Sequence, residues 1–191
     1  MKRRVFISIA ALIVTLSLII SAKGIIWKEY FPPDNSQAVR SDCFSIKEVT
    51  VRGNSMSPFL ESGETVRALF GYYDCNPVQR NDIVLFRYSG NENLLIKFVR
   101  GIPGDNWNLK KTDNGYEIII NGNPVLNSEG NPYLIAESSI RILEIYIKDY
   151  PIIPEKTYLL LGDGLNGSID STHFGLVGKD DILAKVLSFS K

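Results

Sequence analysis

The feature that most constrains this fold is an uncharged apolar segment near the N-terminus, from Val5 to Ala22. A helix needs about 20 such residues to cross the hydrocarbon core of a bilayer. The segment approaches that length, and it extends to Trp27 if the ammonium group of Lys23 reaches the headgroup region. We therefore expect residues 1–27 to form a basic cap and one transmembrane helix. The rest of the 191-residue chain is long enough for one separate domain.

A cleaved secretory signal is the competing interpretation of this segment. Such signals carry an apolar core of only about 7–15 residues and end in a small-x-small cleavage site. Here Ile20-Ser21-Ala22 has isoleucine at the first small position, so we interpret the segment as an anchor. The cap Met1-Lys2-Arg3-Arg4 is basic, and basic residues stay in the cytoplasm. The sequence thus predicts a single-pass protein of the cell membrane, with everything after residue 30 outside the cytoplasm.

Charge and metal-ligand composition exclude several classes of function. The chain has 21 basic and 21 acidic residues and no long run of either, which argues against nucleic-acid binding. It has one histidine, His173, and its two cysteines lack metal-ligand spacing, which disfavours a zinc site. Cys43 and Cys75 have two interpretations, a disulfide formed in an oxidising compartment or two partly buried thiols.

The pattern after the apolar segment predicts a tether over residues 28–45 and an all-β domain over residues 46–191. The tether contains Pro32-Pro33, and the domain begins with apolar and polar residues alternating from Ile46 to Arg52. Further strands are expected at Asp82–Tyr88, Leu94–Val99, Glu117–Ile120, Tyr158–Leu161 and Ile182–Phe189, with Asn121-Gly122 as a hairpin turn. Residues 111–157 contain no catalytic motif and are expected to form an added β lobe. Within them, Ser139–Lys148 fits either a helix or an edge strand.

Ser55 and Lys97 supply a nucleophile and a base without histidine. A serine hydroxyl needs a neighbouring group to take its proton, and His173 lies in a distant segment. Lysine serves as that base when burial lowers its pKa towards neutrality. Lys97 has apolar neighbours from Leu94 to Val99, and the acidic residues closest to it in sequence are Glu92 and Asp105. The pair predicts a Ser–Lys hydrolase.

Four segments in order resemble the motifs of the type I signal peptidase family. They are Gly53-Asn54-Ser55-Met56-Ser57-Pro58, Asn81-Asp82-Ile83-Val84-Leu85-Phe86, Lys97 through Asp105, and Gly162 through Ser171. The resemblance covers residues 49–186. It implies a signal-peptidase-like β domain, with Ser55 as nucleophile and Lys97 as general base. It also implies that Ser168 hydrogen-bonds the lysine, that Asp170 braces the active-site loops, and that no cofactor or metal is required.

The chain departs from the family pattern at two places. The backbone amide of Ser55 is the natural donor to the oxyanion. Many members add a hydroxyl from the residue two positions before the nucleophile, where this chain has Gly53, so a second donor either comes from elsewhere or is absent. Basic residues of the last motif are replaced by Leu165 and Thr172, which deprives Asp170 of its usual partners. Arg100 is one candidate replacement, and backbone amides of the turn around Asp170 are the other.

The resemblance also places the walls of a substrate pocket. The matching positions are Val49, Val51, Met56, Leu60 and Ile96. Branched apolar walls leave room only for side chains the size of alanine, at the first and third positions before the scissile bond. Core packing is an equally good account of Leu60. Phe70-Gly71-Tyr72-Tyr73 forms an aromatic cluster that either packs in a hairpin or enters the bilayer interface.

The sequence as a whole predicts a membrane-anchored serine endopeptidase that cleaves signal peptides from exported preproteins after small residues. Its partners are then preproteins and the lipid bilayer. Two alternatives remain open. One is a dedicated Ser–Lys peptidase that processes a narrow substrate, such as a pilin or conjugative protein. The other is an inactive relative that acts as a binding subunit. A self-cleaving repressor is disfavoured because residues 1–45 offer no DNA-binding helical unit.

Overall fold

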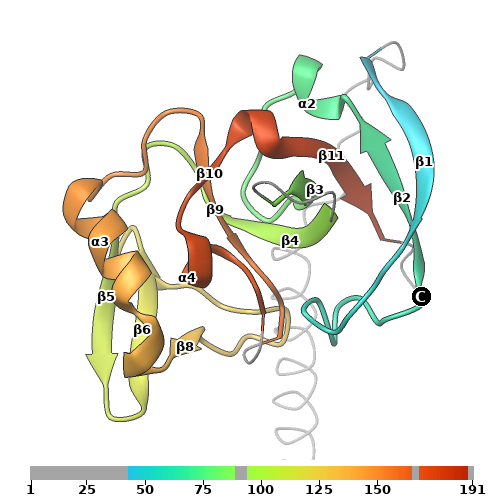
Figure 1. The fold of residues 1–191 in the computed structure, drawn as a ribbon. Helices are drawn as coiled ribbons and strands as arrows, with labels where there is room; N and C mark the ends of the chain where they lie inside the picture. Colours follow the sequence, from blue (N-terminus) through green and yellow to red (C-terminus); the bar gives the residue numbers. More distant parts are fainter. Residues whose placement is uncertain (1–42, 89–93, 165–167, 189–191) are drawn as a thin grey trace, which may run out of the picture. The chain divides into compact units, whose positions relative to one another are not determined.

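The larger of two sheets contains seven strands in the order β1-β2-β11-β3-β4-β9-β10. A computed structural model describes residues 43–88, 94–164 and 168–188, which belong to a structural unit spanning Arg40–Lys191. The strands are β1 (Ser45–Thr50), β2 (Thr65–Phe70), β3 (Ile83–Arg87), β4 (Leu94–Gly101), β9 (Thr157–Leu161), β10 (Val177–Gly178) and β11 (Ile182–Leu187). All neighbours in the sheet are antiparallel. In Figure 1 this sheet occupies the right and centre of the view.

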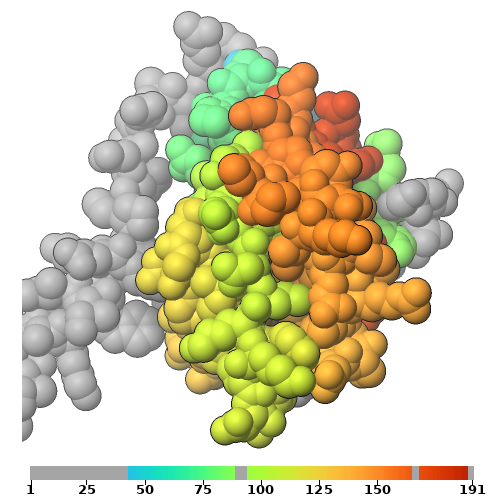
Figure 2. All heavy atoms as spheres, turned by 90° about the vertical axis from the view of Figure 1, so that its left-hand side faces the viewer, coloured from blue at the N-terminus to red at the C-terminus, as the bar shows by residue number. Residues whose placement is uncertain are grey.

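A second, four-stranded sheet lies to the left in Figure 1, next to the longest described helix. Its strands are β5 (Trp107–Thr112), β6 (Gly115–Ile120), β7 (Asn123–Pro124) and β8 (Leu134–Ile135), and the helix is α3 (Arg141–Asp149). Two other short helices are α2 (Tyr72–Cys75) and α4 (Ser171–Phe174), and 3-10 turns cover Glu137–Ser139 and Lys179–Asp181. Figure 2 shows the outer face of this part, where the green-yellow and orange segments of the chain run side by side.

Strand β9 lies between two of the hydrophobic cores. Its side chains alternate in direction, as in any strand. Leu159 and Leu161 pack with Trp107 and Leu143 from the second sheet and α3, whereas Tyr158 and Leu160 pack with the core around Phe86. A third core, around Val66 and Leu85, includes Met56 and Leu60, which follow Ser55 in the chain. Because β9 contributes to two cores, it links the two sheets directly ahead of the last sequence motif.

Most of the expected strands are confirmed, and so is the expected hairpin turn. Asn121 and Gly122 both have positive φ, 51° and 83°, as a type I′ turn requires. Residues Ser139–Lys148 are largely helical, so the helix alternative is correct and the domain is mostly β rather than all-β. Strands β2 and β5 were not expected, and the second sheet begins at Trp107, before the lobe boundary predicted at residue 111.

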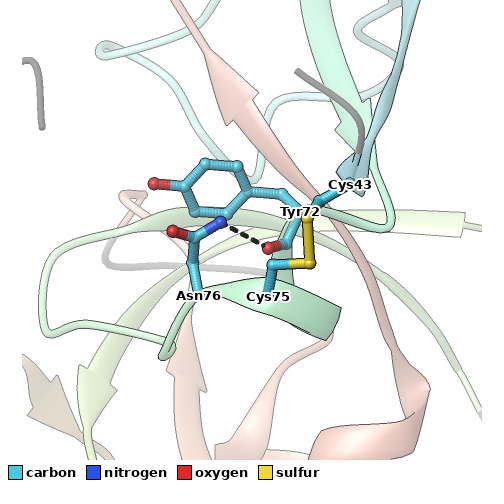
Figure 3. Close-up of a disulfide and its surroundings, with 4 residues drawn as sticks. All are labelled: Cys43, Tyr72, Cys75 and Asn76. Carbon is cyan, nitrogen blue, oxygen red and sulfur yellow. Dashed lines mark hydrogen bonds between the residues drawn. A yellow bond between two sulfur atoms is a disulfide. The ribbon is translucent and has the colours of Figure 1, made fainter. Parts of the chain in front are cut away.

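The two cysteines form a disulfide that fixes the start of β1 to helix α2. Cys43 and Cys75 are 6.1 Å apart at Cα (Figure 3). Beside them, the side-chain amide of Asn76 donates a 2.9 Å hydrogen bond to the carbonyl of Tyr72. A cross-link between residues 32 positions apart restricts the unfolded chain and stabilises the domain by about 3–4 kcal/mol in the chain-entropy model. The disulfide interpretation of these residues is therefore correct.

The aromatic residues that follow β2 pack against neighbouring side chains. Tyr73 is 3 % exposed, and its hydroxyl donates a 3.0 Å hydrogen bond to Asp82. Tyr72 contacts both Phe44 and Tyr73 ring to ring. The packing alternative therefore holds for Tyr73, within the short helix α2 rather than in a hairpin loop.

No helix among residues 43–88, 94–164 and 168–188 combines the length and apolar character needed to cross a membrane. The anchor expected over residues 1–27 and almost all of the tether lie outside the described residues.

Candidate active site

Ser55 and Lys97 meet although 42 positions separate them in the chain. Lys97 lies in the middle of β4, and its ammonium nitrogen donates hydrogen bonds of 2.6 Å to Ser55 Oγ and 2.9 Å to the carbonyl of Ile96. Ser55 lies in the turn that follows β1, where Gly53 takes a positive φ of 76°. The predicted pair is thus in hydrogen-bonding contact, the geometry required of a nucleophile and its base.

Burial gives Lys97 the pKa of a usable base. The side chain is 1 % exposed, and removal from water lowers the pKa of Lys97 from 10.5 to about 8. The negative charge of Asp170 opposes this effect by favouring the ammonium form, but it is the smaller of the two causes. A substantial fraction of Lys97 is then neutral at mildly alkaline pH and able to accept a proton.

The backbone of Ser55 is held by the loop that follows β9. The Ser55 carbonyl accepts hydrogen bonds from the amides of Asp163 at 2.8 Å and Gly164 at 3.3 Å. A Cβ atom at Gly162 would overlap both this carbonyl and the hydroxyl of Ser168, so only glycine permits this approach. The loop Gly162–Gly164 therefore fixes the backbone position of Ser55.

Ser168 lies near this loop, but it does not make the hydrogen bond expected from the sequence. Its side chain is 7 % exposed, and its hydroxyl has no partner among the described residues. The expected contact with Lys97 is therefore not formed in this structure, although Ser168 is buried beside Gly162 in the same site.

Asp170 is held by its own turn and by Gly162. One carboxylate oxygen accepts from the amide and hydroxyl of Thr172, at 3.0 and 2.8 Å, and caps helix α4. The other accepts from the amide of Gly162 at 3.0 Å. The sequence suggested Arg100 or backbone amides as the partners of Asp170, and the backbone amides are the partners observed. Thr172, which stands where the family has a basic residue, supplies an additional donor.

The suggestion that Arg100 pairs with Asp170 is wrong. The Arg100 guanidinium instead lies 3.8 Å from the carboxylate of Asp163, donates to Asn81 at 2.8 Å, and stacks 4.2 Å from the ring centre of Phe98. Both Arg100 and Asp163 are at least 95 % buried, so the charges of each require a partner. Arg100 therefore balances the charge of the loop that holds Ser55.

A cavity of about 390 Å³ adjoins Ser55. It is lined by Glu48, Val49, Thr50, Val51, Arg52, Gly53, Ser55, Met56, Leu85, Leu94, Leu95 and Ile96. Four of the five expected pocket residues are in this lining. Leu60 is not, because it packs in the core with Val66 and Leu85 at 2 % exposure. Leu94 and Leu95 were missed, although they adjoin Ile96 in one apolar run of the sequence.

His173 has no part in this arrangement. It is exposed in α4, and one ring nitrogen lies 3.0 Å from the hydroxyl of Thr172. His173 is therefore a surface residue.

Comparison with known proteins gives a consistent family match. The family model described as "Signal peptidase, peptidase S26" matches residues 37–190. "Signal peptidase IB" of Staphylococcus aureus strain COL is 31 % identical over 151 residues, covering 75 % of this chain and 76 % of that protein. "Signal peptidase I" of Bacillus caldolyticus is also 31 % identical, over 147 residues that cover 75 % of this chain and 78 % of that protein.

Among solved structures, this chain is similar to a signal peptidase I from Enterococcus faecalis V583. The two share 24 % identity with a TM-score of 0.42, over 59 % of this chain and 98 % of that chain.

Proposed function

Because this chain belongs to the S26 family of type I signal peptidases and is a serine endopeptidase, we propose that Ser55 is its nucleophile and Lys97 its general base. The observation that carries this proposal is the 2.6 Å contact between Lys97 Nζ and Ser55 Oγ, made by a lysine that is almost fully buried. Among the described residues, the structure brings no other amine to the hydroxyl of Ser55. Signal peptides of exported preproteins are the proposed substrates, with cleavage after small residues.

The reaction follows from this geometry in two stages. Neutral Lys97 accepts the proton of Ser55 as Oγ attacks the scissile carbonyl, and the amine leaving group then takes that proton as the acyl-enzyme forms. Water, deprotonated by the same lysine, hydrolyses the ester and regenerates Ser55. The backbone amide of Ser55 makes no hydrogen bond within the described residues and is available to the oxyanion.

The strands around the cavity offer a place for an extended peptide. Strand β9 pairs with β4 only from Phe98 to Gly101, so residues Leu94–Lys97 have β3 as their only strand partner among the described residues. Strand β1 forms the edge of its sheet and supplies Val49 to the other wall of the cavity, and Val51, just after the end of β1, lines the same wall. A peptide that adds to the free edge of β4 would have its carbonyls near Ser55 and alternate side chains in the cavity. The apolar wall residues support the preference for small side chains.

The membrane attachment belongs to the same proposal. Residues 1–27 provide the basic cap and anchor, residues 28–45 the tether, and the domain after residue 46 acts outside the cytoplasm. Residues 111–157 are the proposed added lobe, and most of the second sheet and α3 fall within them. This arrangement gives the site access to signal peptides as they emerge from the bilayer.

A panel of preproteins tests the substrate assignment. The full-length protein in detergent micelles or vesicles is incubated with several unrelated preproteins that carry Ala-x-Ala sites, beside a pilin-type precursor. We expect cleavage of the general preproteins immediately after the small residue, shown by the mass of the released chain. Cleavage of the pilin-type precursor alone would indicate a dedicated peptidase. Cleavage of none, by a correctly folded protein, would indicate a binding subunit.

A further inference from the structure

We propose that Ser128 and Tyr133, which lie between strands β7 and β8 of the second sheet, are positioning residues that hold the nucleophile in register with its base. The proposal rests on the catalytic assignment of Ser55 and Lys97. Neither residue belongs to a motif that the sequence singled out, and neither touches the reacting atoms. Both act through the loop Gly162–Gly164.

Ser128 reaches the loop through the side chain of Asp163. Its amide donates a 2.8 Å hydrogen bond to one carboxylate oxygen, and its hydroxyl donates a 2.5 Å hydrogen bond to the other. Asp163 is fully buried, and Arg100 is the only cation within ion-pair distance of it among the described residues. Two donors from a single residue fix both oxygens, and hence the orientation of the Asp163 backbone. The Asp163 amide is the group that binds the Ser55 carbonyl.

Tyr133 reaches the same loop one residue earlier. Its hydroxyl donates a hydrogen bond to the carbonyl of Gly162, while the Gly162 amide donates to Asp170. The ring is 5 % exposed and packs in the core around Trp107. Burial raises the pKa of Tyr133 to about 12, so the hydroxyl remains a proton donor throughout the working pH range.

The segment that carries both residues is held by its own hydrogen bonds. Asn127 is 1 % exposed, and its side-chain oxygen accepts from the amides of Glu129 and Asn131. The backbone of Asn127 is also bonded to Asn131, and the Tyr133 amide bonds to Val125. Because this turn is joined to the sheet at both ends, we expect the hydrogen-bond donors of Ser128 and Tyr133 to keep one position.

The consequence is a chain of contacts from the second sheet to the nucleophile. Ser128 and Tyr133 fix Gly162 and Asp163, and the amide of Asp163 fixes Ser55. A displacement of about 1 Å in a reacting group costs up to about 100-fold in rate. The lobe without catalytic motifs therefore contributes to catalysis by positioning.

The test measures kcat and KM for Ser128→Ala and Tyr133→Phe in the full-length protein with an Ala-x-Ala preprotein. The matched controls are Thr112→Val, which removes a hydroxyl that bonds within the β5–β6 hairpin, and Tyr146→Phe, which removes a hydroxyl from the same core. We expect kcat to fall about 10- to 100-fold in the first pair, with KM nearly unchanged, and to change less than about twofold in the controls. Ser128→Thr, which keeps the donor, should restore most of the loss.

Two further measurements distinguish a positioning role of these residues from a general loosening of the domain. The pH at which kcat/KM reaches half its maximum should be the same in Ser128→Ala as in wild type, because Lys97 stays buried. In Ser128→Ala/Asp163→Asn, the loss should be smaller than the product of the single losses, because both changes break one contact.

Each remaining outcome has a defined meaning. If wild type cleaves and Ser128→Ala and Tyr133→Phe match their controls, this inference is overturned while the proposed function stands. A shift of the pH limb, or a failure of Ser128→Thr to restore activity, would also overturn it. If wild type beside Ser55→Ala shows no difference, the proposed function itself fails.

Discussion

The ammonium nitrogen of Lys97 lies 2.6 Å from the hydroxyl oxygen of Ser55, inside a site where the lysine is 1 % exposed. In this structure the lysine donates that hydrogen bond. The proposed catalytic state requires the reverse direction, with a neutral amine that accepts the serine proton. In the proposed mechanism the protonation of Lys97 therefore controls activity, and two predictions depend on the pKa of Lys97.

The first prediction concerns the pH dependence of the rate. Below a pKa of about 8, Lys97 is charged and cannot accept a proton, so kcat/KM should fall about tenfold for each pH unit. Above that pKa the rate should level off, which gives an alkaline optimum. Measurement of kcat/KM from pH 6 to pH 10 on one preprotein checks this expectation. A profile that is flat across this range would show that Lys97 is not the base.

The second prediction concerns stability. The pKa of Lys97 is about 8 when folded, below its ordinary value of 10.5, so the unfolded chain binds more protons between these two pH values. Stability should therefore rise by about 3 kcal/mol as pH increases through this window, relative to a variant without the ammonium group. Below pH 8 both states are protonated, and the full cost of the buried charge remains.

Lys97→Met provides the comparison for this stability prediction. Denaturant unfolding at pH 7 should show the variant to be more stable than wild type, and the difference should shrink by pH 10. Other groups that titrate between pH 7 and pH 10 are present in both proteins, so their effects on the stability difference cancel. An equal difference at both pH values would mean that Lys97 has an ordinary pKa in the folded protein.

The third prediction concerns Asp170 and Arg100, which do not contact each other. Asp170 is bound by Gly162 and Thr172, whereas Arg100 is paired with Asp163. The coupling between Asp170→Asn and Arg100→Leu in the double variant should therefore be smaller than the coupling between Arg100→Leu and Asp163→Asn. The Arg100→Leu/Asp163→Asn pair should not add, because both changes affect one ion pair. Coupling between Arg100 and Asp170 with additivity between Arg100 and Asp163 would contradict the observed pairing.

The fourth prediction separates a pocket wall from a core residue. Val49 lines the cavity, so Val49→Ala should allow cleavage after side chains larger than alanine. Leu60 is in the core, so Leu60→Ala should lower stability by about 2–5 kcal/mol and leave the substrate preference unchanged. A set of preproteins with alanine, valine or leucine before the scissile bond measures the preference. The assignment is wrong if Leu60→Ala broadens cleavage and Val49→Ala does not.

The predictable parts of this structure are those encoded by local patterns. Alternating residues revealed β1, an Asn-Gly pair revealed the hairpin after β6, and the apolar run around Lys97 indicated its burial. Strand β5 was missed because only Trp107 in it is fully buried, and the strand is defined by pairing with β6 rather than by its own pattern.

The contacts of the last motif were only partly predictable. Asp170 bonds within its own turn, a short-range arrangement that its position before Thr172 suggests. The contact of Ser128 with Asp163 spans 35 positions and depends on how the second sheet packs against the end of β9. No local pattern marks such a contact. Equally, the residue spacing left Cys43 and Cys75 undecided between a disulfide and free thiols until their positions in the fold were known.

The most direct test of the central claim compares wild type, Ser55→Ala, Lys97→Ala and the double variant on one Ala-x-Ala preprotein at pH 9. Circular dichroism confirms that each is folded. We expect wild type to release a mature chain that begins directly after the small residue. Each single variant should lose at least about 1000-fold in kcat. The kcat of the double variant should be no lower than that of the less active single variant, because the two residues act as one unit. Retention of most activity by Lys97→Ala, or a large further loss in the double variant, would contradict the Ser55–Lys97 assignment.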